Sequence, residues 1–101
     1  MSQANVTLDR EAIAAFCRRH HIRRLSLFGS VLRDDFHEGS DVDLLVEFEP
    51  DSIPGLFRIV GMEQELSALV GRKADLRTAG DLSKYFRERV IATAEPIYVS
   101  G

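Results

Sequence analysis

Leu27-Phe28-Gly29-Ser30 is separated by ten residues from Asp41-Val42-Asp43-Leu44-Leu45-Val46-Glu47-Phe48. The first apolar run ends in a Gly-Ser turn, and the second run begins with two aspartates that flank one valine. Because side chains alternate faces along a strand, Asp41 and Asp43 should project from one face, with their Cα atoms roughly 6.5 Å apart. At that spacing both carboxylates can serve one metal pair. The pattern therefore predicts a site for phosphoryl or nucleotidyl transfer where the second strand begins.

Hydrophobic periodicity in the rest of the chain alternates between helical and strand patterns. Three consecutive apolar residues in the strand over residues 41–48 are typical of an interior strand that is buried on both faces. The order of elements predicts an α/β fold, with a small mixed sheet and flanking helices, in a single domain over residues 1–101. The expected elements are a helix capped by Thr7 or Asp9 that carries Ile13, Phe16, Cys17 and His20 on one face, strands over residues 22–28 and 41–48, a helix from Leu56 to Gly71, a strand over residues 73–78, a helix capped by Ser83 and ended by Pro96, and a strand over residues 97–99.

Composition narrows the range of partners and compartments. The chain has 101 residues, of which 45% are hydrophobic, and this is enough for one core. Its formal net charge of -3 argues against nonspecific nucleic-acid binding. The lone Cys17 excludes an intramolecular disulfide and a zinc site built from cysteines. No uncharged run approaches the ~18 residues that a membrane span needs. We therefore expect a cytoplasmic protein with no membrane segment and no direct nucleic-acid partner.

Four residues near the two aspartates are candidates for nucleotide binding. Gly29 would let the backbone approach phosphates, and Ser30 can donate its hydroxyl and its amide to phosphate oxygens. Arg33 lies one turn later and either neutralises triphosphate charge, docks a partner or is a solvated surface arginine. Ser40 either orients Asp41 or is a turn residue.

These residues resemble the G-S-x10-D-x-D signature of the DNA polymerase beta-like nucleotidyltransferase superfamily, and within it the minimal nucleotidyltransferases. The resemblance continues through residues 44–50, 71–76 and 94–98, so it covers nearly the whole chain. It implies the nucleotidyltransferase fold, in which two Mg²⁺ ions are held by Asp41 and Asp43.

The resemblance also implies a third carboxylate, Asp75, which would hold the catalytic metal and assist deprotonation of the acceptor. The residues alone leave another interpretation of this position. Lys73, Asp75 and Arg77 alternate with apolar residues, and such a pattern is also typical of a solvated strand face.

Minimal nucleotidyltransferases of this size accompany HEPN-domain ribonuclease toxins, and the resemblance implies transfer of AMP from ATP to a tyrosine of such a toxin. Because 101 residues leave no room for an acceptor-binding domain, the acceptor is expected on another protein or on a second subunit. The assembly would then be a hetero-oligomer or a homo-oligomer. Two other functions are compatible with the residues: an antitoxin that inhibits by occupancy alone, and a subunit of a small-molecule nucleotidyltransferase. The intact carboxylates favour catalysis over occupancy, and the absence of a substrate domain disfavours the small-molecule enzyme.

Overall fold

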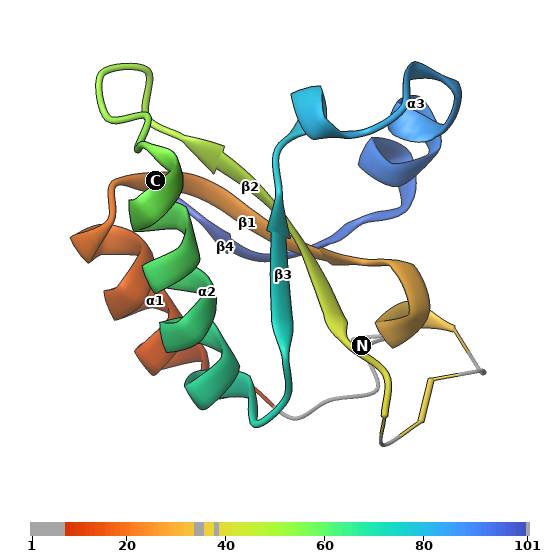
Figure 1. The fold of residues 1–101 in the computed structure, drawn as a ribbon, viewed down its shortest axis with the longest axis horizontal. Coiled ribbons are helices and arrows are strands. Elements are labelled where there is room, and N and C mark those ends of the chain that lie inside the picture. The colour runs from red at the N-terminus through yellow and green to blue at the C-terminus, as the bar shows by residue number, and fades with distance from the viewer. Residues whose placement is uncertain (1–7, 34–35, 38, 101) are drawn as a thin grey trace.

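The computed structural model describes residues 8–33, 36–37 and 39–100. Helices and strands alternate along these residues, and this confirms the expected α/β class. Among the described residues, no helix combines the length and the apolar character that crossing a bilayer requires. The elements are, in order, α1 (Arg10–Arg19), β1 (Ile22–Phe28), the 3-10 turn η1 (Gly29–Leu32), β2 (Val42–Phe48), α2 (Leu56–Val70), β3 (Ala74–Arg77), the 3-10 turn η2 (Ala79–Asp81), α3 (Lys84–Thr93) and β4 (Glu95–Val99) (Figure 1).

The four strands form one mixed sheet in the order β3-β2-β1-β4. Strand β1 runs antiparallel to both β2 and β4, whereas β2 and β3 are parallel. A parallel pair requires a crossover connection, and α2 provides it here. Strand β2 therefore lies in the interior of the sheet, as its apolar run predicts.

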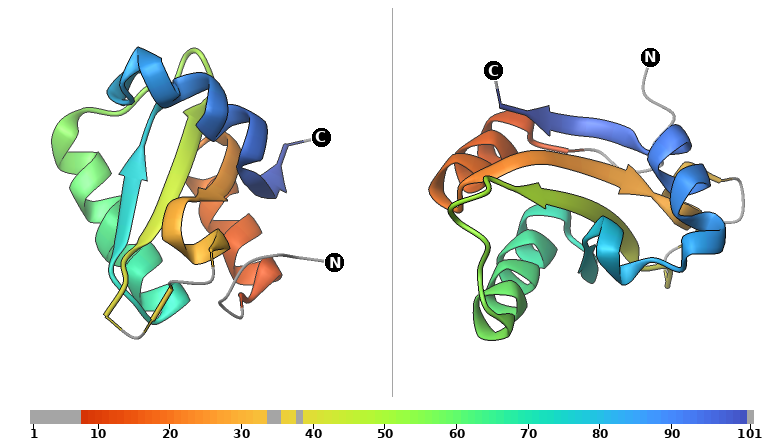
Figure 2. Two further views of the ribbon diagram at one scale, coloured as in Figure 1. Left: turned by 90° about the vertical axis from the view of Figure 1, so that its right-hand side faces the viewer. Right: turned by 90° about the horizontal axis from the view of Figure 1, so that it is seen from above.

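The two faces of β2 have different surroundings. Val42, Leu44 and Val46 are almost completely buried, in a core that includes apolar residues of α1 and α2. Figures 1 and 2 show these two helices on the same side of the sheet. The intervening residues Asp43 and Glu47 are more exposed and point to the opposite face. Any chemistry carried by Asp43 therefore takes place on the face that α1 and α2 do not cover.

Two side chains of α2 attach the helix to the neighbouring edge strand. Ser67 donates its hydroxyl to the Glu63 carbonyl, at 2.7 Å, and accepts the Ala74 amide, at 2.9 Å. The Glu63 carboxylate accepts the Leu76 amide at 2.7 Å. The helix ends as expected at Gly71, which adopts a left-handed conformation with φ of 74°. These contacts satisfy backbone donors of β3 and hold the strand in its position along α2.

The predicted helix starts are confirmed where they lie within the described residues. Asp9 caps α1 by accepting the Ala12 amide at 3.1 Å, and Ser83 caps α3 by accepting the Tyr85 amide at 3.2 Å. The alternative cap, Thr7, lies outside the described residues. His20 follows the last residue of α1 as its C-cap.

Some predicted boundaries were wrong. Strand β2 begins at Val42, so Asp41 precedes it, and β3 is shorter at both ends than residues 73–78. Pro96 does not end α3, which finishes at Thr93; it lies inside β4 instead. Strand β4 is at the edge of the sheet, where a residue without an amide hydrogen is tolerated.

Candidate active site

Strand register brings two of the three predicted carboxylates together. Asp43 on β2 is paired with Asp75 on the parallel strand β3 and with Phe28 on β1. Adjacent strands lie about 4.8 Å apart, and paired residues point to the same face. Asp43 and Asp75 therefore lie side by side, both partly buried, on the face that α1 and α2 leave uncovered.

The surroundings of Asp43 disfavour its ionised form. Burial is the main cause that raises its pKa above the usual value, followed by the neighbouring carboxylate of Asp75 and, to a smaller extent, that of Asp41. The guanidinium groups of Arg77 and Arg33 act in the opposite direction without cancelling the effect. A cation at this position would oppose the rise in the pKa of Asp43, because it would favour the ionised carboxylate.

Gly29 provides the space that the Asp43 carboxylate occupies. A Cβ atom built on Gly29 would lie 2.6 Å from Asp43 Oδ2, and its φ is +78°, a conformation that L side chains rarely adopt. The next residue, Ser30, lies within the tight turn η1, and its carbonyl accepts the Arg33 amide at 2.9 Å. Gly29 of the Gly-Ser turn therefore lies directly against the Asp43 carboxylate.

Asp41 lies beside this pair but is directed toward a lysine. Its Oδ2 atom is 4.0 Å from Lys73 Nζ, and the amide of Val42 donates to the Lys73 carbonyl at 2.8 Å. Within the described residues, no three His, Cys, Asp or Glu side chains are arranged to hold a metal ion. The donors are nevertheless of the type that Mg²⁺ prefers, since all three are carboxylates. Their chemistry therefore fits the predicted metal, with Asp41 paired to Lys73 in this structure.

Ser40 and Arg33 have different surroundings. The Ser40 hydroxyl accepts the His37 amide at 3.0 Å, and the Ser40 amide donates to the His37 carbonyl at 2.9 Å. Ser40 thus makes the contacts of a turn residue. Arg33 is exposed and lines a cavity of about 340 Å³ together with Gly29 and with Arg89 of α3. Sequence reasoning does not single out Arg89, because no local pattern indicates that the last helix returns to the Gly-Ser turn.

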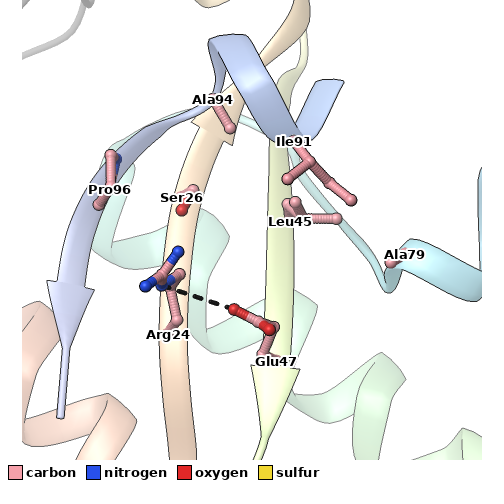
Figure 3. Close-up of a pocket in the computed structure, with 8 residues that line it drawn as sticks. All are labelled: Arg24, Ser26, Leu45, Glu47, Ala79, Ile91, Ala94 and Pro96. Carbon is pink, nitrogen blue, oxygen red and sulfur yellow. Dashed lines mark ion pairs between the residues drawn. The ribbon is translucent and has the colours of Figure 1, made fainter. Parts of the chain in front are cut away.

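A second cavity lies on the same face of the sheet, between the strands and α3. Leu45 and Glu47 follow Asp43 at two-residue steps and line this cavity with Ser26 and Ile91 (Figure 3). An ion pair between Arg24 and Glu47, at 3.5 Å, lies at its border. The volume is about 130 Å³, slightly less than the roughly 150 Å³ of a cavity that holds a benzene ring. The cavity is therefore comparable in size to a single ring.

The sequence profile of the nucleotidyltransferase domain family matches residues 9–97, which include the Gly-Ser turn and all three carboxylates. The chain belongs to this family. The nucleotidyltransferase is 37% identical, over 81 residues, to the protein adenylyltransferase MntA of Thermococcus cleftensis. That match covers 80% of this chain and 78% of its relative.

Solved structures agree with this assignment. A minimal nucleotidyltransferase of 37% identity superposes with a TM-score of 0.71, covering 86% of this chain and 87% of the other. A toxin-antitoxin structure with AMP-PNP has a TM-score of 0.73 at 19% identity, covering 92% of this chain and 75% of the other, and shows the same fold. The expected nucleotidyltransferase fold is thereby confirmed for this nucleotidyltransferase.

Proposed function

We propose that this nucleotidyltransferase is a metal-dependent protein adenylyltransferase. It transfers AMP from ATP to a tyrosine of a HEPN-domain ribonuclease toxin and thereby acts as an antitoxin. The observation that carries the proposal is the register pairing of Asp43 with Asp75, with the Asp43 carboxylate lying against Gly29. The named activity of the Thermococcus cleftensis relative supports protein as the acceptor class.

Each residue has a role in this proposal. Asp41, Asp43 and Asp75 would hold Mg²⁺, which when bound neutralises charge on the triphosphate and on the attacking oxygen. Asp75 also accepts the proton of the acceptor hydroxyl. Ser30 donates hydrogen bonds from its hydroxyl and its amide to phosphate oxygens. Because Gly29 has no side chain, it leaves room for the Asp43 carboxylate.

The acceptor side chain can be placed on the same face of the sheet. The cavity lined by Leu45 and Ser26 is comparable in size to one ring and begins two residues along β2 from Asp43. We assign it to the ring of the acceptor tyrosine, whose hydroxyl would point toward the carboxylates. A nucleotide would not fit in about 130 Å³.

One observation is also compatible with an antitoxin that inhibits by occupancy alone. Large apolar side chains are exposed on two elements: Leu56 and Phe57 at the start of α2, at 75% and 92%, and Tyr85 on α3, at 91%. Exposed apolar side chains that gather into one patch are typical of surfaces that contact other proteins. Such a surface would serve a catalytic antitoxin and a purely binding one equally, so an experiment has to separate them.

The test is co-expression of the chain with its cognate toxin. The variant Asp41→Asn/Asp43→Asn should fold and still bind the toxin, but it should no longer protect the cells. Mass spectrometry should detect an AMP adduct on a toxin tyrosine with the unchanged chain only. The control variant Glu11→Gln/Asp51→Asn makes the same change in charge at two exposed positions away from the site and should protect fully.

Full protection by Asp41→Asn/Asp43→Asn, with no adduct on the toxin in the unchanged pair, would overturn the catalytic proposal and support occupancy. An adduct on a residue other than tyrosine would correct the acceptor and leave the reaction in place. Modification of a small molecule without any change to the toxin would instead support a small-molecule enzyme.

A further inference from the structure

Arg89 of α3 lies at the Gly-Ser turn, although it is remote from the turn in sequence. It lines a cavity of about 340 Å³ together with Gly29, Leu32, Arg33 and Thr93. The cavity is therefore built by the segment that follows β1 and by the last helix.

Two of the residues that line this cavity, Arg33 and Arg89, carry a positive charge. The Thr93 hydroxyl is already used, because it donates to the Arg89 carbonyl at 2.7 Å within the helix. Both arginines are exposed, and none of the described residues that line the cavity is acidic. Among the described residues, Arg89 has no carboxylate partner. Two guanidinium groups over one cavity are suited to a ligand with several anionic oxygens, since each can donate to two of them.

Gly29 is shared between this cavity and the carboxylate site. It lines the cavity, and it is also the residue against which the Asp43 carboxylate lies. An anionic chain that begins at the carboxylates and passes Gly29 therefore enters the cavity next. A nucleoside triphosphate has this form, with its reacting phosphate at one end of a linear polyphosphate.

We propose that Arg89, together with Arg33, binds the terminal phosphates of the nucleoside triphosphate in this cavity. The inference rests on the proposed function, because it takes the triphosphate as the substrate. Arg89 holds the leaving pyrophosphate, and α3 is thereby part of the nucleotide site. The other explanation of Arg89 is a solvated surface arginine, which would contact no ligand.

Calorimetric titration with ATP, AMP and inorganic tripolyphosphate at one ionic strength tests the proposal. Arg89→Ala should weaken the binding of ATP and of tripolyphosphate about tenfold, the effect of losing one charge-assisted hydrogen bond at an exposed position. AMP lacks the terminal phosphates, and its affinity should change less than twofold. Arg89→Lys keeps the charge without the planar fork and should be intermediate. Lys84→Ala removes a positive charge from the same helix outside the cavity and should bind all three ligands normally.

Thermal unfolding of each variant separates a loss of contact from a loss of structure. Arg89→Ala should melt close to the unchanged chain, since its side chain is exposed. Unchanged ATP affinity in Arg89→Ala, or equal weakening of ATP and AMP, would overturn the assignment of the cavity and leave the proposed transfer reaction intact. Failure of the unchanged chain to bind ATP and tripolyphosphate would overturn both.

Discussion

Replacing Gly29 with alanine should destabilise the protein about twice as much as replacing Gly71, although the two backbones are nearly alike. Their φ angles are +78° and +74°. Placing an L residue in this backbone conformation destabilises the folded state by roughly 1–2 kcal/mol. Alanine also lowers the conformational entropy of the unfolded chain, which favours folding by roughly 0.4–1 kcal/mol. The backbone alone therefore costs about 1 kcal/mol. That is the expected effect of Gly71→Ala, where nothing lies within 4 Å of the added Cβ.

The additional cost at Gly29 comes from Asp43. The added Cβ would lie 2.6 Å from Asp43 Oδ2, so the carboxylate has to rotate away from its present position. A side chain turned about 30° from its preferred rotamer costs roughly 0.5–1.5 kcal/mol, which brings the total for Gly29→Ala to about 2 kcal/mol. For a chain of this length, 1 kcal/mol corresponds to roughly 4–8 °C in melting temperature.

Scanning calorimetry of the two single variants and of Gly29→Ala/Asp43→Ala measures these terms. The double variant lacks the carboxylate that meets the new Cβ, so adding Gly29→Ala to Asp43→Ala should cost only the backbone term of about 1 kcal/mol. Displacement of a catalytic group by ~1 Å can reduce a rate about 100-fold, and we expect such a loss of transfer in Gly29→Ala and none in Gly71→Ala. Equal destabilisation by the two single variants, with normal transfer in both, would refute this account of the contact.

Two further predictions concern the paired carboxylates. Burial and Asp75 raise the pKa of Asp43 in the folded state. Protonation of Asp43 therefore stabilises the folded state relative to the unfolded chain below the usual pKa of 3.8, and this stabilisation is lost as the pH rises through the raised pKa. At pH 7 without metal, Asp43→Asn should therefore be more stable than the unchanged chain by about 1 kcal/mol, which is the repulsion between two charges ~5 Å apart in a nearly aqueous medium. Thermal unfolding measured as a function of pH should show that this difference in stability disappears at low pH. A difference that stays constant with pH would contradict the prediction. Asp75→Asn should retain most nucleotide affinity, measured by calorimetry, but lower the rate of transfer on the order of a hundredfold; equal losses of affinity and rate would mark Asp75 as structural.

Local patterns in the sequence were sufficient to predict the helix ends, because these depend on residues that are close together in the chain. The caps at Asp9 and Ser83 and the glycine that ends α2 were predicted at the positions where the structure has them. Pro96 was misinterpreted because a residue without an amide hydrogen is compatible with a helix end and with an edge strand. The choice between the two depends on β4 lying outside β1 in the sheet, and no local pattern contains that information.

In the candidate site, too, the sequence was sufficient for residues that are close together in the chain and insufficient for contacts that only the fold creates. Asp41 and Asp43 are recognisable together because they are near neighbours in the chain. The position of Asp75 beside Asp43 depends on the packing of α2, where Ser67 and Glu63 hold the amides of β3. Arg89 was not identified, because only the folded chain brings α3 to the Gly-Ser turn.

The way β3 is attached to α2 makes the active site sensitive to the length of the turn between them. Residues 71–73 connect a helix whose end is held by Ser67 to a strand whose register places Asp75 opposite Asp43. Deleting one residue from this turn would advance the strand by one position and present Leu76 where Asp75 now lies. A substitution at Arg72 leaves that spacing intact. The chemistry of the site therefore depends on the number of residues in this turn more than on their identity, so tags, linkers or insertions designed into this protein should avoid it.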